Sequence, residues 1–164
     1  MIYFKPIGYI YTPFQTVENM PVQAAAAKGI RGTIMIKDEF AAGLKDIEEF
    51  SHLYLVYQFH KFEGHSLVVT PFLDDKTHGI FATRSPKRPC GIGISIVKLN
   101  GVNGGELSVE NVDMINETPL LDIKPYIPEF DIIEGEVKTG WYARKSKNLH
   151  ETRSDGRFKN KIFF

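Results

Sequence analysis

The sequence predicts a mainly β fold, a single antiparallel β-barrel with short peripheral helices and a C-terminal extension. Short runs rich in β-branched and aromatic residues follow one another along the chain, and turn residues separate them. Long helical periods do not alternate with these runs, as they would in a parallel α/β protein. A length of 164 residues with 43% hydrophobic residues suits one compact domain with its own core.

The strand candidates are the runs in which apolar residues are dense or alternate with polar ones. They are Ile30 to Lys37, Leu53 to His60, Leu67 to Phe72, Ile92 to Leu99, Glu106 to Asp113 and Pro119 to Ile127.

Helical signals are weaker. Apolar residues recur at helical spacing after Asp38, which predicts a helix with Asp38 as its N-cap that runs toward Phe50 and is interrupted by Gly43. A second helical or loop stretch is expected around Ala24 to Lys28, and Asn100 to Gly105 reads as a hairpin loop.

Charge divides the chain near Glu136. From Leu99 to Glu136 there are nine acidic residues and one basic residue, whereas from Val137 to Phe164 there are eight basic and two acidic ones. We therefore expect a barrel domain over residues 1–136 and a basic extension over residues 137–164. Basic residues interleaved with Trp141, Tyr142 and Phe158 suit a phosphate backbone and stacked bases, and a solvated hairpin is the alternative.

Several common kinds of site are not indicated. The glycines of Gly101 to Gly105 precede an alternating strand rather than a helix, so this stretch predicts a turn and not a dinucleotide cradle. The five histidines lack the paired spacing of metal ligands, so no metal site is expected. The lone Cys90, the lack of a membrane-length apolar run and the lack of a leader pattern favour a cytoplasmic protein.

A cationic loop is the first informative feature. Between Arg84 and Lys98 there are four basic residues, no acidic residue and two prolines that restrict the backbone. Such a loop suits a carboxylate or phosphate, which Arg84 and Arg88 can bind with bidentate geometry. A stiff surface loop with solvated charges is the alternative.

A polar row on a strand is the second. In the segment from Pro119 to Tyr126, alternation places Asp122, Lys124 and Tyr126 on one face and Leu121 and Ile123 on the other. Such a row on an apolar strand indicates a cleft, because buried polar groups need partners. An exposed ion pair between Asp122 and Lys124 is the competing interpretation.

The order of these motifs resembles the TsaA-like family of TrmO type. The resemblance rests chiefly on three stretches and covers roughly residues 3 to 131. The stretches are His78-Gly-Ile-Phe-Ala-Thr-Arg-Ser-Pro-Lys-Arg-Pro89, Ile92-Gly-Ile-Ser95 and Leu121-Asp-Ile-Lys-Pro-Tyr126.

The resemblance implies a β-barrel methyltransferase that uses S-adenosyl-L-methionine. It implies methyl transfer to N6 of a threonylcarbamoyl-modified adenosine beside the tRNA anticodon, by a homodimer. The implied cofactor residues are Gln23, His60, Lys61, Arg84, Ile94, Asp113, Met114, Ile115 and Asn116.

The row on the last strand supplies candidate catalytic residues. Asp122 is expected to orient the attacking amine, Lys124 to hold a phosphate or the acidic modification, and Tyr126 to stack on the target base or donate a hydrogen bond to it. A noncatalytic RNA- or nucleotide-binding barrel is the alternative function, and methyl transfer to a small molecule is a third.

Two turns depart from the family pattern. Where members read Arg-Pro-Asn-Pro-Ile-Gly, this chain has Arg88-Pro-Cys-Gly-Ile-Gly93, and Gly91 is expected to loosen the loop. Where members read Asp-Gly-Thr-Pro, it has Asn116-Glu-Thr-Pro119, which puts an amide in place of a carboxylate.

Overall fold

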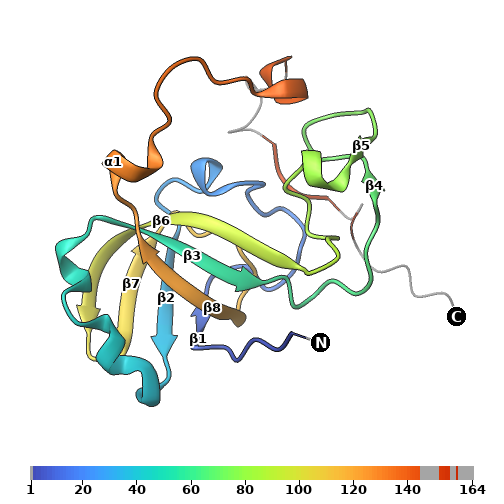
Figure 1. Ribbon diagram of the computed structural model, residues 1–164. Helices are drawn as coiled ribbons and strands as arrows, with labels where there is room; N and C mark the ends of the chain where they lie inside the picture. Colours follow the sequence, from blue (N-terminus) through green and yellow to red (C-terminus); the bar gives the residue numbers. More distant parts are fainter. Residues whose placement is uncertain (1, 145–151, 156–157, 159–164) are drawn as a thin grey trace, which may run out of the picture.

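A closed antiparallel barrel forms the body of the protein (Figure 1). The computed structural model describes residues 2–144, 152–155 and 158. Within these residues the strands of the barrel follow the order β1-β2-β7-β6-β3-β8, and β8 pairs with β1 to close it. Their bounds are β1 Gly8–Tyr11, β2 Arg31–Ile36, β3 His52–Gln58, β6 Ile92–Asn103, β7 Glu106–Glu110 and β8 Thr118–Pro125. The predicted fold class is confirmed.

Alternation of side chains builds the core of the barrel. In β3, Leu53, Leu55 and Tyr57 are buried, while the residues between them face outward and are half-buried. The same period places Ile34 and Leu107 of the neighbouring strands inside. One face of each strand therefore fills the barrel and the other is left for covering segments or ligands.

The sequence patterns did not predict β1. It is only four residues long, too short for alternation to stand out from its surroundings. Gly8 of this strand lies against the backbone of β2, where a Cβ would come within 2.3 Å of the Met35 carbonyl oxygen. The close approach of these two strands thus requires glycine.

The helix predicted from Asp38 to Phe50 is wrong in type and in its cap. The structure has two 3-10 helices, η2 (Asp38–Leu44) and η3 (Ile47–Glu49), and the N-cap of η2 is Lys37, without a side-chain cap. The break falls at Asp46, which has a left-handed φ of 65°, and not at Gly43. The apolar spacing reflects packing on the barrel, since Leu44 belongs to the core and Phe40 and Ile47 pack against it.

The hairpin loop predicted at Asn100 to Gly105 is shorter in the structure. β6 continues to Asn103 through an irregularity between Leu99 and Gly101, and only Gly104 and Gly105 separate it from β7. Gly104 has a φ of 58°, which a tight turn requires and which glycine adopts at little cost.

A smaller unit packs beside the barrel. The predicted strand Leu67 to Phe72 is reduced to β4 (Val68–Val69), which pairs with β5 (His78–Gly79), and η4 (Ile80–Ala82) follows. A second apolar cluster of Val69, Ile80 and Phe158 lies here. Three further short helices are η1 (Ala24–Ala26), α1 (Pro128–Asp131) and η5 (Gly140–Arg144).

Part of the basic extension is built into the fold. Ser154 exchanges backbone hydrogen bonds with Asn19 and Met20, and its hydroxyl donates to the Val17 carbonyl oxygen. Phe158 is 5% exposed and packs on Phe72. Five basic residues of the extension, Lys145, Lys147, Arg157, Lys159 and Lys161, lie outside the described residues.

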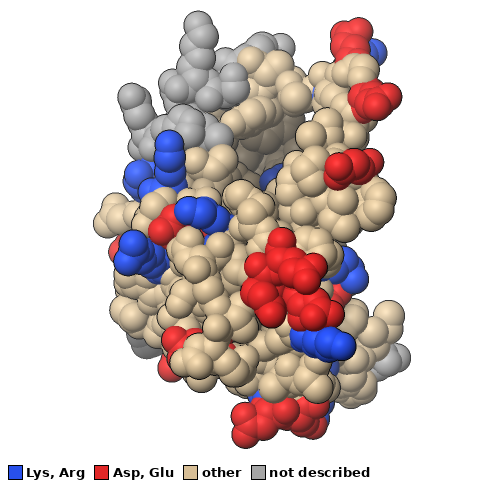
Figure 2. Space-filling model, turned by 90° about the vertical axis from the view of Figure 1, so that its left-hand side faces the viewer, with Lys and Arg blue, Asp and Glu red and all other residues tan. Residues whose placement is uncertain are grey.

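The exterior is unevenly charged. In the view of Figure 2, Asp and Glu side chains predominate over the centre of the face and along the arm that projects at the upper right, whereas Lys and Arg gather mainly toward the left margin. Among the helices of the described residues, none has the length and apolar character needed to cross a membrane.

Candidate functional site

A cleft of about 1130 Å³ opens beside β3 and β6. Its walls come from the inner side chains Tyr57 and Ser95, from the outer side chains Tyr54 and Ile94, and from the cationic loop that contains Arg84. The cleft thus continues from the interior of the barrel onto its outer face. Its volume exceeds that of most small-molecule sites, so it has room for two ligands together.

Most of the residues implied to bind the cofactor are brought together here. Asn116 does not line the cleft; its side-chain oxygen accepts a hydrogen bond from the Thr12 amide at 3.0 Å and so fixes the turn before β8. The eight residues that do line the cleft are Gln23, His60, Lys61, Arg84, Ile94, Asp113, Met114 and Ile115.

Asp113 ends a buried chain of hydroxyl groups. The Ser95 hydroxyl donates to the Asp113 carboxylate at 2.6 Å, and the Tyr57 hydroxyl lies 3.0 Å from Ser95, where it donates in turn. Part of the Asp113 carboxyl meets the cleft, but the protein around it solvates a charge poorly, and this desolvation raises its pKa to about 6. Burial, and next the nearby Asp113 charge, raise the pKa of Tyr57.

Gly93 makes room for this chain. A Cβ at Gly93 would lie 2.4 Å from the Tyr57 ring and 2.9 Å from Phe59. The ring therefore passes directly over the backbone of β6 and reaches Ser95 two residues further on. A larger residue at position 93 would displace Tyr57 and, through Ser95, the carboxylate.

His60 carries an unused nitrogen in the wall of the cleft. Its Nδ1 lies 3.5 Å from the Thr118 hydroxyl, which itself donates to the Ile115 carbonyl oxygen. Its Nε2 is buried and has no hydrogen-bond partner among the described residues. Burial, and next the Lys61 charge, lower the pKa of the ring, so it is neutral at neutral pH. A ligand group is the natural partner for this nitrogen.

The two arginines of the cationic loop make different contacts. Arg84 is exposed and donates to the Gln23 side-chain oxygen at 3.0 Å, which joins two of the implied cofactor residues. Arg88 donates to the carbonyl oxygens of Ile80 and Thr83 at 3.1 and 2.7 Å. Arg88 thus holds the backbone of its own loop through Nη1, and the bidentate binding of an anion by both arginines stays a prediction.

The residue that was expected to loosen this loop is itself held in place. Gly91 donates to the Arg88 carbonyl oxygen at 3.2 Å and accepts from the Phe59 amide at 2.8 Å. Its φ of 56° lies in the left-handed region, which a proline could not adopt. The loop is a hydrogen-bonded turn.

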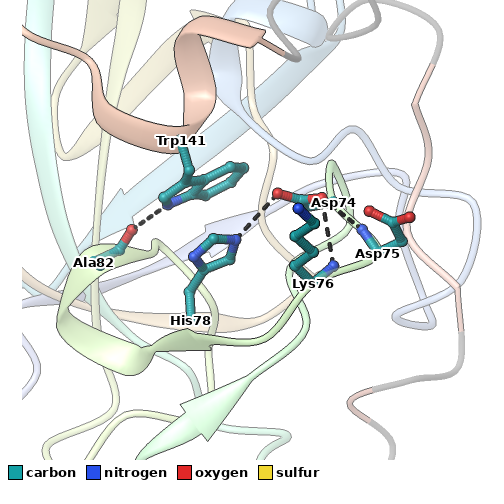
Figure 3. A network of polar contacts seen from close by, with 6 residues as sticks. All are labelled: Asp74, Asp75, Lys76, His78, Ala82 and Trp141. Carbon is teal, nitrogen blue, oxygen red and sulfur yellow. Dashed lines mark hydrogen bonds and ion pairs between the residues drawn. The ribbon is translucent and has the colours of Figure 1, made fainter.

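Trp141 fastens the segment after the barrel to the smaller unit (Figure 3). Its ring stacks on His78 with centroids 4.7 Å apart, and its Nε1 donates to the Ala82 carbonyl oxygen at 2.8 Å. The His78 Nε2 atom lies 3.1 Å from a carboxylate oxygen of Asp74. This hydrogen bond is the largest cause that lowers the pKa of the Asp74 carboxyl. Trp141 and Tyr142 thereby become part of the cleft wall.

The polar row of β8 lies outside the cleft lining. Asp122 and Lys124 form an ion pair at 2.9 Å and are 47% and 66% exposed. The hydrogen bond with Asp122 raises the pKa of Lys124. Tyr126 packs on Tyr54 and His52, which do line the cleft.

Pairing nevertheless places this row on the same outer face as the cleft. Asp122 lies opposite Val56 of β3, which lies opposite Ile94 of β6, so the three residues form a line across the sheet. Two strand spacings separate Asp122 from Ile94, roughly 10 Å. An extended substrate that crosses the outer face would reach both.

A bulge corrects the expected alternation on β8. Tyr57 pairs with Leu120 and Val56 with Asp122, which leaves Leu121 as the extra residue. Leu120 is buried and Ile123 packs on the core, so these two side chains point inward. The expectation is therefore correct for Ile123, and Leu120 takes the inward position that was expected for Leu121. The outward direction of Asp122 and Lys124 agrees with their exposure.

The turn before β8 keeps a left-handed backbone without a glycine. Glu117 has a φ of 61° and is exposed, at the position where the related pattern has glycine. A non-glycine residue is strained there. We expect Glu117→Gly to raise the free energy of unfolding by about 0.5 to 1 kcal/mol, measured by urea denaturation. Gly29, which has a φ of 78°, provides the reverse control, because Gly29→Ala should destabilise; a destabilised Glu117→Gly protein would contradict the explanation.

Sequence reasoning missed the supports of the site. The strand pattern assigns no site role to Tyr57 or Ser95, and the motif assigns none to Phe81. Ser95 carried a signal, because it is a polar residue at an inward position between the apolar residues of β6. Over the described residues, no group of three or more histidine, cysteine or acidic side chains is arranged to hold a metal ion.

The closed antiparallel barrel, with a cleft beside β3 and β6, places the protein in the class of β-barrel proteins, which is distinct from the doubly wound α/β fold. Residues 9–132 match the family model of the tRNA-methyltransferase O N-terminal domain, and the chain belongs to this family. The resemblance to the TsaA-like family is thereby confirmed.

Related proteins of three kinds are similar to the chain. A probable S-adenosyl-L-methionine-binding protein of Pyrococcus abyssi is 49% identical over 96% of this chain and 85% of its own length. A human tRNA (adenine(37)-N6)-methyltransferase is 37% identical over 77% of this chain and 30% of its own length. A crystal structure of TrmO from Pseudomonas aeruginosa superimposes with a TM-score of 0.72 at 34% identity, over 86% of this chain and 62% of that one. The chain thus spans less than two thirds of the two methyltransferases.

Proposed function

We propose that the chain is a methyltransferase that uses S-adenosyl-L-methionine and acts on N6 of a threonylcarbamoyl-modified adenosine beside the tRNA anticodon. The observation that carries the proposal is the gathering of eight implied cofactor residues around one cleft, with the desolvated carboxyl of Asp113 among them. The names of the relatives support the cofactor and the tRNA substrate.

The chemistry of the cleft fits this cofactor. When bound, S-adenosyl-L-methionine supplies an activated methyl group on a sulfonium sulfur. Asp113 would accept hydrogen bonds from the ribose hydroxyls, and Ile94 and Met114 would pack on the adenine. Arg84, steadied by Gln23, would pair with the carboxylate of the methionine part. The unpartnered His60 Nε2 would receive a polar group of the same ligand.

The chain's remaining task is to align the acceptor amine, because an in-line displacement depends chiefly on geometry. We propose that Asp122 accepts a hydrogen bond from this amine. One of its oxygens accepts from the Ile123 amide at 2.9 Å and the other pairs with Lys124 at 2.9 Å, and a carboxylate has further lone pairs free. Lys124 would contact a phosphate or the acidic modification, and Tyr126 the base.

The test combines cofactor binding with methyl transfer. Calorimetry with S-adenosyl-L-methionine should show one site, and the fluorescence of Trp141, the only tryptophan of the chain, should change because it lines the same cleft. Labelled methyl groups should then enter bulk tRNA that carries the threonylcarbamoyl modification, and not tRNA that lacks it.

The same assays separate the two competing functions. Failure to bind the cofactor at high micromolar concentration, with tRNA binding retained, would indicate a noncatalytic RNA-binding barrel. Cofactor binding without incorporation into tRNA would favour a small-molecule acceptor. Incorporation into both modified and unmodified tRNA would keep the enzyme class and remove the threonylcarbamoyl requirement.

We also propose that the protein works in the cytoplasm as a homodimer. Phe130, Ile132 and Ile133, which follow β8 and lie outside the cleft lining, are 80%, 62% and 74% exposed. Apolar groups exposed in this number favour contact with a second copy. Light scattering coupled to size exclusion should give twice the monomer mass, and a monomer at micromolar concentration would contradict the proposal.

A further inference from the structure

We propose that Phe81 is a stacking platform on which a nucleobase of the RNA substrate rests at the mouth of the cleft. The inference rests on the proposed function and adds to it a substrate-binding residue to which neither the sequence motif nor the cofactor chemistry gives a role. Three features support it: the exposure of the ring, the rigidity of the turn that carries it, and the place of the ring relative to the cofactor residues.

The exposure of Phe81 contrasts with that of its neighbours. Its side chain is 75% exposed, whereas Ile80 before it is 1% exposed and Thr83 after it is 8% exposed. The short helix η4 is therefore firmly seated on the protein and directs one large apolar ring outward. Because the ring lines the rim of the cleft, a ligand that enters the cleft passes it.

The turn that carries the ring is held at three carbonyl oxygens by side chains. Arg88 donates to the carbonyls of Ile80 and Thr83, and Trp141 donates to that of Ala82 at 2.8 Å (Figure 3). The Thr83 hydroxyl also donates to the Ile80 carbonyl, at 2.9 Å. This rigidity lowers the entropy lost when a flat ligand is stacked on the ring.

A nucleobase fits the surroundings of the ring. The Arg88 guanidinium lies 5.8 Å from the centroid of Phe81, a cation–π distance, and so supports the ring from one side. Arg84, three residues further on, is exposed, lines the same cleft and adds positive charge near the ring. An aromatic face next to arginines is the usual means of binding an unstacked base together with its backbone.

The base that stacks on Phe81 belongs to the RNA and not to the cofactor, because Phe81 lies nearer to the solvent than the residues that would hold the cofactor. Met114, which is implied to pack on the cofactor adenine, is 3% exposed, and Asp113 lies in the inner wall beside Ser95. Phe81 is on the open side of the cleft. A cofactor in the inner part leaves this ring for the second ligand, for which the volume of the cleft has room.

The test compares Phe81→Ala, Phe81→Trp and wild type for binding of a tRNA anticodon stem-loop, measured by fluorescence anisotropy with saturating cofactor. We expect Phe81→Ala to weaken binding by about 10- to 100-fold and Phe81→Trp to restore it within about 3-fold. The salt dependence of binding should stay unchanged, because no charge is removed. Phe4→Ala is the matched control, since Phe4 is also largely exposed, at 62%, and lies outside the cleft lining.

A second readout reports stacking itself. A stem-loop with 2-aminopurine next to the target adenosine should lose fluorescence on binding to wild type and to Phe81→Trp, and keep it with Phe81→Ala. Calorimetry should give the same cofactor affinity for all three proteins.

The outcomes separate this inference from the proposed function. An unchanged RNA affinity of Phe81→Ala in a protein that methylates tRNA would overturn the platform alone, as would a loss confined to cofactor affinity. If the wild type binds RNA through Phe81 but does not methylate it, the role of Phe81 would stand and the proposed methyltransferase function would be contradicted.

Discussion

Replacing Asp113 by Asn is expected to weaken S-adenosyl-L-methionine binding by about 100-fold and, at the same time, to stabilise the free protein. The loss follows from the removal of a charged acceptor for two ribose hydroxyls, each bond being worth about 1.5 to 3 kcal/mol. The gain follows from the desolvated carboxyl, because an amide can still accept the Ser95 hydrogen bond without carrying a charge.

The stability gain has a defined pH dependence. The pKa of Asp113 is about 6 in the folded protein, above its ordinary value of 3.8, so the folded state favours the protonated form. The wild type therefore has the full stability contribution of this group below about pH 4 and loses it as the pH rises through 6. Above pH 7 the variant should be more stable by about 1 to 3 kcal/mol, and near pH 4 the two should agree.

Thermal unfolding of both proteins between pH 4 and 8, with calorimetry at pH 7.5, measures the two effects. Glu117→Gln in the neighbouring turn is the control, because this carboxylate is exposed and outside the cleft lining, and neither quantity should change. A variant that binds the cofactor as wild type does would remove Asp113 from the binding site. A variant less stable at pH 8 would contradict the desolvation of the carboxyl.

Replacing Asp122 by Asn is expected to lower the rate of methyl transfer by at least about 100-fold and to leave cofactor affinity unchanged. The carboxylate would orient an amine whose lone pair is delocalised into the adenine ring, and an amide accepts more weakly and in one direction only. Because Asp122 lies two strands from Ile94 on the outer face, it is placed to act on the substrate and not on the cofactor.

Single-turnover kinetics with saturating tRNA and cofactor isolates this step. Lys124→Gln is the informative comparison, since it breaks the ion pair of Asp122 but keeps the carboxylate. We expect it to weaken tRNA binding and its salt dependence while the rate at saturation falls by less than about 5-fold. An unchanged rate of methyl transfer by Asp122→Asn would exclude Asp122 from the reaction and would indicate that the ion pair on β8 is only a surface contact.

Much of the barrel was predictable because its strands are half-buried. In β3 the alternation of Leu53, Leu55 and Tyr57 is a local signal that needs no knowledge of the rest of the chain. Closure by β1 was not predictable, since four residues carry little periodicity and their pairing with β2 and β8 is a long-range property. The helical spacing after Asp38 misled because packing on the barrel repeats at nearly the same interval as an α-helix.

The candidate site, like the fold, has one part that the sequence predicts and one part that it does not. The resemblance supplied the residue types, and the structure brings all but Asn116 of the implied cofactor set to one cleft. The sequence did not show that Asn116 is used to hold Thr12, or that Arg88 is used to hold its own loop, because both bonds depend on the folded path of the backbone. The partners Tyr57 and Ser95 are 38 residues apart, beyond any local pattern.

One wall of the cleft is formed by residues near the C-terminal end of the sequence. Ser154 and Phe158 line it from a segment that pairs with Asn19 and Met20, whereas the last strand of the barrel ends at Pro125. During synthesis the barrel can therefore close before this wall exists, so the ability to hold a ligand is acquired after the fold itself. Ligand binding in turn adds its free energy to the docking of this segment and protects it from proteases.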